Sequence, residues 1–431
     1  MRILLTGATG LIGGAIARAL LDQGHELVCA VRNPSRLAIA GPRCRALEVD
    51  LATAPGAHWW AVHLQGVDAV VNAVGILREQ PGQSFDALHH RAPAELFRAC
   101  AHAGVPCAIQ ISALGADEQA GSNYHRSKRA ADDVLRAMPL RGAVVQPSLV
   151  YSPQGESSGL FMGLASAPML MMPRRGGMAV QPVHLDDVVA GVLALLRQPP
   201  KPVATLAFVG PRELPLRGYL ASLRAQLGWR LRQVVLPLPE AVFLASARIA
   251  GRVPGSPLDA ETAGMLLRGN AAPASAFTQL LGRAPRDPDS FMNRQEAPLL
   301  RTRAVLGWTL PVLRIALAAM WIWTAIVSFG LYPVEQSREL LARVGLQGGL
   351  ATLALYGAAM LDLLLGVLTL WAPPRWRPAV WASQLLLVAG YTVLITLFLP
   401  EYWLHPYGPV SKNLPIMAVI GLLWALETRR S

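Results

Sequence analysis

The chain has 431 residues, enough for two or three domains, and with 53% hydrophobic and 15% charged residues it is too apolar for a purely soluble protein. Its net charge is +12, but the basic residues are scattered, which favours a membrane surface or an anionic cofactor and argues against nucleic acid. The four cysteines show no C-x-x-C spacing, so we expect reduced thiols and no metal site.

The first predicted elements are a strand at residues 3–5 and a helix at residues 11–23, joined by a turn with the spacing G-x-x-G-x-x-G. A strand that turns sharply into a helix directs backbone N–H groups and the positive end of the helix dipole at one point. A diphosphate binds there if no Cβ blocks it, and an ordinary tight turn is the alternative. The predicted contacts are Gly7, Thr9, Gly10, Leu11, Ile12 and Gly13.

The second predicted strand, residues 26–31, ends at a candidate specificity residue. An acidic residue there would hold the ribose 2′-hydroxyl of NAD, but this chain has Arg32. Because an arginine suits a 2′-phosphate, the sequence favours NADP(H) over NAD(H); the alternative is a surface arginine without this role. A third strand is predicted at residues 47–51, which places Asp50 and Leu51 beside the adenine.

A fourth strand, predicted from residue 67, runs into a turn of small residues where the backbone approaches the cofactor. The predicted contacts are Asn72, Ala73, Val74 and Gly75. A helix at residues 85–103 and a fifth strand at residues 107–112 follow. This alternation predicts an α/β fold with a doubly wound parallel (Rossmann) sheet, and the cofactor should cross its carboxyl edge.

The candidate catalytic residues lie at that edge. Ser112 ends the fifth strand, and Tyr124 and Lys128 are one helical turn apart on one face of the next helix. We expect the ammonium to lower the pKa of Tyr124 toward neutrality, so that the phenol exchanges a proton with a carbonyl oxygen. Ser112 would hold that oxygen during hydride transfer. Tyr124 and Lys128 are also predicted to contact the cofactor. A helix-surface pair without catalytic function is the alternative.

These motifs together resemble the short-chain dehydrogenase/reductase superfamily over about residues 1–300. The motifs are Thr6-Gly-Ala-Thr-Gly-Leu-Ile-Gly13, Asp50-Leu51, Asn72-Ala-Val-Gly75, Ser112-Ala-Leu-Gly-Ala and Tyr124-x-x-x-Lys128. They are most similar to the extended and atypical branch, which includes the nucleotide-binding accessory subunit of respiratory complex I. That subunit is thought to hold NADPH without turnover, so the resemblance supports binding more firmly than catalysis.

One position departs from the superfamily pattern. The asparagine that its enzymes use in the helix after the fourth strand is replaced by Leu88-His89-His90. His89 either takes over the proton relay or packs in the core, and packing is favoured because histidines are often structural.

Residues 1–150 are predicted to form the NAD(P)-binding core, and residues 151–300 a substrate or interaction lobe that completes the dehydrogenase-like domain. The apolar stretch at residues 160–172 is too short to span a bilayer and is interrupted by Pro168. It is expected in the core, or else as an apolar rim facing the membrane. Residues 240–250 are a second candidate for lying against lipid.

After a linker at residues 301–311, an all-α transmembrane domain is predicted at residues 312–431, with spans at about 312–331, 349–372, 380–399 and 411–426. Basic residues precede the first span, separate the second from the third and close the chain. The positive-inside rule then predicts a multi-pass protein of the inner membrane, with both termini and the nucleotide domain in the cytoplasm. This region resembles the DoxX-like family of four-helix membrane proteins, some members of which are linked to quinone-coupled oxidation.

Asp362 is the only strong charge well inside a predicted span. Intramembrane carboxylates are costly and usually face a partner or a polar cavity. Arg314 and Lys412 are the candidate partners, and both a structural ion pair and a functional site are compatible with the sequence.

The sequence therefore predicts a membrane-anchored NAD(P)(H)-dependent oxidoreductase of the short-chain dehydrogenase/reductase type. Its substrate would be a lipophilic carbonyl, alcohol or quinone, because tethering to a bilayer raises the local concentration of such molecules. One alternative is a non-catalytic NADPH-binding accessory or redox-sensing subunit that docks a membrane protein. A sugar-nucleotide epimerase or dehydratase is a weaker alternative.

Overall fold

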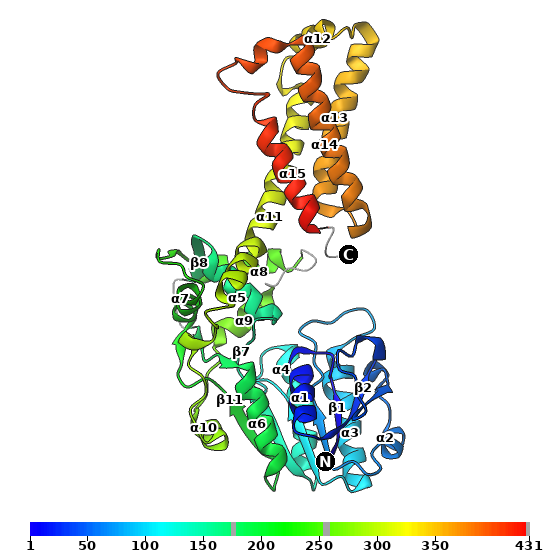
Figure 1. Cartoon of the computed structure of the whole chain (residues 1–431), viewed down its shortest axis with the longest axis vertical. Helices are drawn as coiled ribbons and strands as arrows, with labels where there is room; N and C mark the ends of the chain where they lie inside the picture. Colours follow the sequence, from blue (N-terminus) through cyan, green and yellow to red (C-terminus); the bar gives the residue numbers. More distant parts are fainter. Residues whose placement is uncertain (174–177, 253–258, 428–431) are drawn as a thin grey trace. The chain divides into compact units, whose positions relative to one another are not determined.

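The computed structural model describes residues 1–173, 178–252 and 259–427, so Arg429 and Arg430 at the basic end of the chain lie outside the described residues (Figure 1). The chain divides into two compact units, Met1–Val305 and Leu306–Ser431. The predicted lobe at residues 151–300 thus belongs to the same compact unit as the nucleotide-binding core.

The centre of the first unit is a seven-stranded sheet in the order β11-β6-β5-β4-β1-β2-β3, and every neighbouring pair is parallel. The strands are β1 (Arg2–Thr6), β2 (Glu26–Val31), β3 (Cys44–Glu48), β4 (Ala69–Asn72), β5 (Cys107–Ile111), β6 (Arg141–Pro147) and β11 (Ala204–Phe208). The strand order reverses between β1 and β4, which is where ligands bind in such sheets. The predicted doubly wound parallel fold is confirmed.

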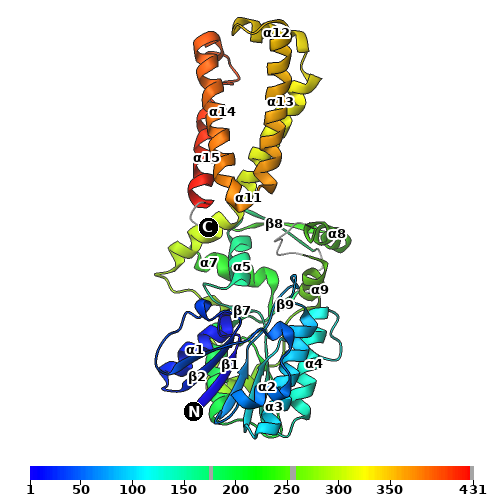
Figure 2. The same cartoon turned by 90° about the vertical axis from the view of Figure 1, so that its right-hand side faces the viewer.

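Helices cover both faces of the sheet because its strands are apolar on both sides (Figure 2). On β1, Ile3 and Leu5 pack into one core while Leu4 packs into the other. The first core is closed by α1 (Leu11–Asp22), α6 (Leu185–Arg197) and α10 (Ser275–Leu281). The second is closed by α2 (Ala57–His63), α3 (Ala92–Ala103), preceded by the π-helical turn η3 (Asp86–Arg91), and α4 (Asn123–Ala137).

The lobe is built from short elements around a third core. They are β7 (Val150–Tyr151), α5 (Glu156–Ser166), β8 (Met169–Pro173), β9 (Ala179–Val180), β10 (Val183–His184), β12 (Leu214–Pro215), α7 (Leu216–Gln226), β13 (Val234–Leu238), α8 (Glu240–Ala250) and α9 (Ala260–Arg268). The apolar stretch at residues 160–172 is split at Pro168 into α5 and β8. Its side chains divide between core and surface, since Phe161 and Met162 are buried whereas Met169 and Met171 are exposed.

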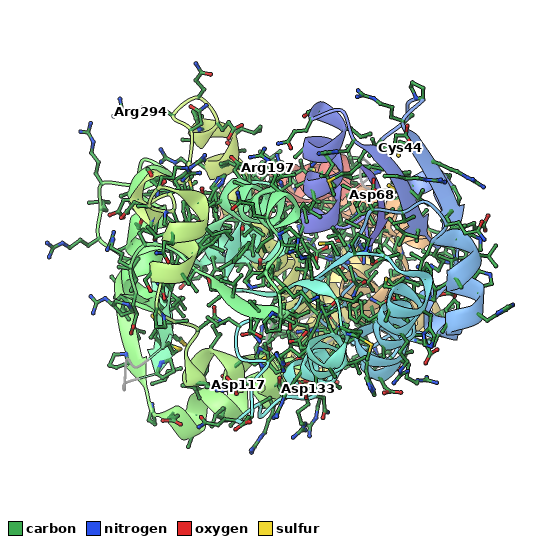
Figure 3. All side chains as sticks on the ribbon, turned by 90° about the horizontal axis from the view of Figure 1, so that it is seen from below. Cys44, Asp68, Asp117, Asp133, Arg197 and Arg294 are labelled. Carbon is green, nitrogen blue, oxygen red and sulfur yellow. The ribbon has the colours of Figure 1, made fainter. Side chains whose placement is uncertain are left out.

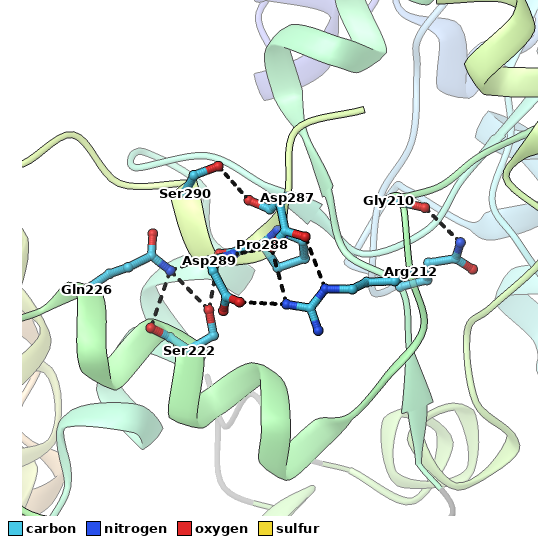
Figure 4. A network of polar contacts seen from close by, with 9 residues as sticks. Gly210, Arg212, Ser222, Gln226, Asp287, Pro288, Asp289 and Ser290 are labelled. Carbon is cyan, nitrogen blue, oxygen red and sulfur yellow. Dashed lines mark hydrogen bonds and ion pairs between the residues drawn. The ribbon is translucent and has the colours of Figure 1, made fainter. Parts of the chain in front are cut away.

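A polar network fixes the end of the lobe to α7 (Figure 4). Arg212 Nε lies 3.0 Å from Asp287 Oδ2, and its Nη2 lies 2.6 Å from Asp289 Oδ2. Gln226 Nε2 of α7 donates to the carbonyl oxygen of Pro288 at 2.8 Å. The short helix η4 (Pro288–Ser290) is therefore held in place before the chain leaves the lobe.

The second unit is helical. Its elements, the first of which begins in the lobe, are α11 (Ala297–Ile326), η5 (Val327–Leu331), α12 (Val334–Arg343), α13 (Gly348–Trp371), η6 (Pro374–Trp376), α14 (Arg377–Phe398), η7 (Pro400–Trp403) and α15 (Asn413–Glu427). The stretches Ala297–Leu331, Gly348–Trp371 and Pro374–Phe398 are long and apolar enough to cross a membrane. The predicted linker at residues 301–311 is part of α11. The fourth predicted span forms α15, whose 15 residues reach about 22 Å, less than a bilayer core of about 30 Å.

Neither of the two candidate partners, Arg314 and Lys412, forms an ion pair with Asp362 among the described residues. Arg314 Nη1 instead lies 3.2 Å from Glu427 Oε1, and its Nε donates to the carbonyl oxygen of Thr369. Asp362 is 4% exposed, and among the described residues its Oδ1 has no hydrogen-bond partner and it makes no ion pair with Lys412.

Candidate nucleotide-binding and catalytic site

The glycine-rich turn between β1 and α1 has the geometry of a diphosphate cradle. Gly7 has φ +72°, and a Cβ on it would lie 2.5 Å from the carbonyl oxygen of Ala73. A Cβ on Gly13 would lie 2.2 Å from the carbonyl oxygen of Gly7. These two glycines are thus required by the close approach of β4 and α1 to the turn.

Gly10 differs from the other two glycines because it faces open space. Its Cβ would meet only the Gly7 carbonyl oxygen, at 3.3 Å, and the residue is exposed. Gly10 is also the N-cap of α1 and provides no side chain to accept the N–H groups of the first helical turn. Those N–H groups, with the exposed Thr9 and Leu11 beside them, fit an anionic diphosphate.

The predicted contacts after β4 separate into a buried residue and an accessible turn. Asn72 is fully buried, accepts a hydrogen bond from Thr6 Oγ1 and donates to Gln110 Oε1 at 2.6 Å. Its side chain therefore ties β1, β4 and β5 together and is not exposed for contact with a ligand. Ala73 and Val74 are half-buried and Gly75 is exposed, so the backbone of this turn is the part that a ligand can approach.

At the other end of the predicted cofactor site, Arg32 is exposed directly after β2, beside the side-chain amide of Gln83. The third strand ends three residues earlier than predicted, because Asp50 caps the turn η2 (Leu51–Thr53). The Asp50 carboxylate accepts the Ala52 N–H at 2.9 Å. Asp50 is exposed and Leu51 is half-buried.

Lys128 of α4 links the carboxyl ends of two strands. Its Nζ donates to the carbonyl oxygens of Val74, at 2.8 Å, and Ile111, at 3.1 Å, the residue before Ser112. Tyr124 lies one turn earlier on α4, edge-on to the rings of Phe85 and His89. The structure thus brings Ser112, Tyr124 and Lys128 to the edge where β4 and β5 end.

The expected effect of Lys128 on Tyr124 is wrong. Burial, together with the charge of Asp132, raises the pKa of Tyr124 to about 12. Burial also lowers the pKa of Lys128 to about 8, an effect that Asp132 opposes. Lys128 donates its hydrogen bonds to backbone carbonyl groups, and its charge is not among the causes of the pKa shift of Tyr124. The phenol of Tyr124 is therefore protonated at neutral pH.

Asp132 is a buried member of the cluster that the sequence analysis missed. Ser112 Oγ donates to Asp132 Oδ2 at 2.5 Å, and Asp132 is completely buried. Burial raises the pKa of Asp132 to about 6, although Ser112 and Lys128 oppose this rise. While Asp132 is ionised, the Ser112 hydroxyl proton points at it, and the oxygen of Ser112 is left to accept a hydrogen bond.

His89 packs in the core, as the sequence analysis favoured. Its Nε2 accepts the N–H of Ile76 at 2.9 Å, and its Nδ1 lies 3.0 Å from Ser127 Oγ. Ser127 Oγ in turn donates to the carbonyl oxygen of Tyr124. Burial, with a smaller effect of Lys128, lowers the pKa of His89 to about 2. His89 therefore stays neutral and braces the turn after β4 against α4.

Residues of the lobe contact the start of α4 and the loop before it. Glu261 Oε1 of α9 accepts the N–H of Tyr124 at 3.2 Å. Arg268 Nη2 contacts both carboxylate oxygens of Asp117, at 2.7 and 2.8 Å. On α4 itself, Arg129 Nη1 donates to the carbonyl oxygen of Asp117, and its Nε lies 3.4 Å from the carboxylate of Asp133 (both aspartates are labelled in Figure 3). Within the described ranges no group of three or more His, Cys, Asp or Glu residues could hold a metal ion.

Each of the two units contains a match to a known protein family. Residues 7–174 match the family described as NAD(P)H-binding, and residues 318–421 match the DoxX-like family. A ceramide reductase of Caulobacter vibrioides is 31% identical over 46% of this chain and 61% of its own length. The mouse NADH dehydrogenase [ubiquinone] 1 alpha subcomplex subunit 9 is 23% identical over 56% of this chain and 64% of its own. The chain thus spans less than two thirds of the length of these relatives.

A solved nucleoside-diphosphate-sugar epimerase from Staphylococcus aureus superposes with a TM-score of 0.53 at 17% identity, over 68% of this chain and 99% of the epimerase. At this identity the likeness shows the fold alone. The sheet order, the glycine cradle and the family matches agree with the resemblances found in the sequence. The chain joins an N-terminal NAD(P)-binding Rossmann domain, similar to the short-chain dehydrogenases/reductases, to a C-terminal DoxX-like domain.

Proposed function

We propose that this protein is a membrane-anchored reductase that transfers hydride from a nicotinamide dinucleotide to a carbonyl group of a lipophilic substrate. The observation that carries the proposal is the position of Ser112, Tyr124 and Lys128 at the carboxyl ends of β4 and β5. This edge also holds the open glycine cradle, so a dinucleotide bound at the cradle runs past these side chains. A bound nicotinamide would supply the hydride.

In this proposal each part of the site has one task. The backbone N–H groups around Gly10 hold the diphosphate, and the Arg32 guanidinium holds a 2′-phosphate, which favours NADP(H). Tyr124, which is protonated at neutral pH, gives its phenol proton to the substrate oxygen. Lys128 fixes the ends of the two strands beside the substrate.

Two observations favour a lipophilic substrate in particular. The first is the membrane domain, which tethers the site to a bilayer and so raises the concentration of lipid-dissolved substrates around it. The second is the similarity to a protein named for its action on a ceramide. The basic residues before the first predicted span and between the second and third spans support a location in the inner membrane with the nucleotide domain in the cytoplasm.

A second candidate function is a non-catalytic NADPH-binding accessory subunit. It is favoured by the similarity to the mouse NADH dehydrogenase subunit and by the hydroxyl of Ser112, whose proton is already engaged by Asp132. In this case Lys128 and His89 only stabilise the turn after β4. The sugar-nucleotide alternative is supported by fold likeness alone.

The Tyr124→Phe variant separates the two candidates. We expect at least a 100-fold lower rate of NADPH oxidation with a long-chain ketone, because the variant lacks the proton donor. The affinity for NADPH should change less than twofold. Tyr219→Phe is the matched control, since Tyr219 lies buried in the lobe core and its variant should keep the full rate.

Two results would contradict the proposed reaction. One is an unchanged rate in Tyr124→Phe. The other is a wild-type protein that binds NADPH tightly but oxidises it with neither a long-chain ketone nor a quinone, which would favour the accessory subunit.

A further inference from the structure

The strands β8 and β13 form a parallel two-stranded ribbon that is apolar on both faces. On the inner face, Leu170 and Met172 belong to the lobe core. On the outer face the register pairs Met169 with Val234 and Met171 with Leu236. A ribbon with one solvated face normally carries polar residues there. The four outer side chains are instead large and apolar, and between 39% and 57% of each is exposed.

Hydrogen bonds fix the ribbon to the rest of the lobe, so its outer face is an ordered part of the lobe surface. Gln233 Nε2, directly before β13, donates to the carbonyl oxygens of Leu164 and Ala167 at 2.6 and 2.8 Å. The buried Arg224 donates to the carbonyl oxygens of Ala165 and Leu231. These bonds fix both strands to α5 and α7, and an exposed apolar patch on a fixed surface usually marks an interaction site.

The apolar surface continues along the chain. Leu231, just before β13, is largely exposed, and α8 follows β13 directly and contacts β8. On α8, Val242 and Ile249 are exposed as well, in the segment that the sequence analysis singled out for contact with lipid.

The segment that forms β13 and α8 is rich in positive charge. The segment from residue 230 to residue 252 carries four exposed arginines and one exposed acidic residue, Glu240. The arginines are Arg230, Arg232, Arg248 and Arg252. An apolar face with a basic rim suits the boundary between acyl chains and anionic headgroups. A partner protein of ordinary composition would not require this excess of positive charge.

The helix that leads into the first predicted span, α11, begins in the lobe core that the ribbon covers. Leu300 and Ala304 of the first turns of α11 pack in the same core as the inner face of the ribbon. The first predicted span begins at residue 312, only about 12 Å of helix beyond Ala304. The chain between the lobe core and the first predicted span is therefore short.

We propose that the outer face of the β8–β13 ribbon, together with α8, inserts into the headgroup region of an anionic bilayer. The ribbon is thus a second membrane contact, made by the nucleotide-binding unit itself and separate from the spanning helices. This proposal does not depend on the proposed reaction.

The test uses the full chain in lipid nanodiscs with a fluorescent label at single introduced cysteines. Cys44→Ser is the parent, because Cys29, Cys100 and Cys107 are buried and Cys44 is partly exposed. Met171→Cys and Val234→Cys place the label on each strand of the outer face. Val62→Cys on α2, which is 59% exposed, is the matched control.

We expect lipids brominated on their acyl chains to quench the labels at positions 171 and 234 at least twofold, and to leave the label at position 62 unchanged. The quenching should fall when phosphatidylglycerol is replaced by phosphatidylcholine. Labels at positions 171 and 234 that are quenched no more than the control would overturn the proposal. A spectral shift without quenching would also overturn it, because the face would then be covered by protein, either the second unit or a second copy.

Discussion

The glycine cradle and the cluster on α4 are both parts of one site, but they are specified by the sequence in different ways. In the cradle, Gly7 and Gly13 are fixed by backbone contacts between residues close in the chain or on the neighbouring strand. In the cluster, Tyr124 and Lys128 obtain much of their environment from residues far away in the chain, such as Glu261 and Val74. Backbone geometry of this kind can be predicted from residue spacing. The charge state of a side chain cannot, because it depends on how the whole fold buries that side chain.

The largest effect is expected where the backbone itself would be forced apart. Gly13→Ala places a Cβ 2.2 Å from the carbonyl oxygen of Gly7, and neither backbone can move without separating α1 from β1. We expect a loss of several kcal/mol in the unfolding free energy of the first unit. Hydrogen exchange of the β1 amides measures it. Gly159→Ala on α5 is the control, because its Cβ would meet nothing within 4 Å, and equal losses in both variants would contradict this account of the cradle.

A smaller but more selective effect is expected at Gly10. The added methyl group fits the protein, with one contact at 3.3 Å, but it projects into the space assigned to the diphosphate. Gly10→Ala should keep the stability of the unit and weaken NADPH binding at least 30-fold. Calorimetric titration of NADPH tests this prediction. If Gly10→Ala binds NADPH as tightly as Gly159→Ala does, the diphosphate does not bind at Gly10.

The cofactor preference is expected to depend on Arg32. Arg32→Ala should weaken NADPH binding about tenfold, the effect of losing one charge-assisted hydrogen bond, and leave NADH binding unchanged. Arg45→Ala, an exposed arginine on the neighbouring strand β3, is the control. Equal weakening of both dinucleotides in Arg32→Ala would show that Arg32 does not recognise the 2′-phosphate.

The smallest effect tests the electrostatics of the cluster. Burial raises the pKa of Asp132 from its ordinary value of 3.8 to about 6, so the native state binds the proton more tightly. Stability contributed by this proton is present at low pH and is lost as the pH rises through 6, by about 1 kcal/mol between pH 5 and 7. Asp132→Asn should remove this decline, as measured by hydrogen exchange of β5 at both pH values.

Asp133→Asn is the control for Asp132→Asn, because Asp133 is the next residue on α4 and its side chain is half exposed. It should keep the decline between pH 5 and 7. If both variants behave alike, or if Asp132→Asn keeps the decline, the buried carboxylate is not the group that titrates.

The parts of the structure that could be predicted are those with a periodic or local cause. The alternation of strands and helices predicted the parallel sheet, and the long apolar runs predicted the helices of the second unit. Asp132 was within reach of the sequence analysis, because it lies four residues after Lys128 on the same helix face. Glu261 and the Arg268–Asp117 pair were not, since more than 130 residues separate them from their partners.

The errors have equally physical causes. The third strand was placed too late because Val49 is apolar and buried, although Asp50 already caps the following turn. Arg314 was one of two candidate partners of Asp362, because opposite charges in apolar helices are expected to pair. The structure instead pairs Arg314 with Glu427 of α15, a helix whose register the sequence does not reveal.

The most direct test of the account is a calorimetric titration of NADPH into the full chain in nanodiscs, with NADP⁺, NADH and NAD⁺ titrated in parallel. The account predicts saturable binding of one dinucleotide per chain, with the phosphorylated forms bound more tightly. Folded protein that binds none of the four dinucleotides would contradict it.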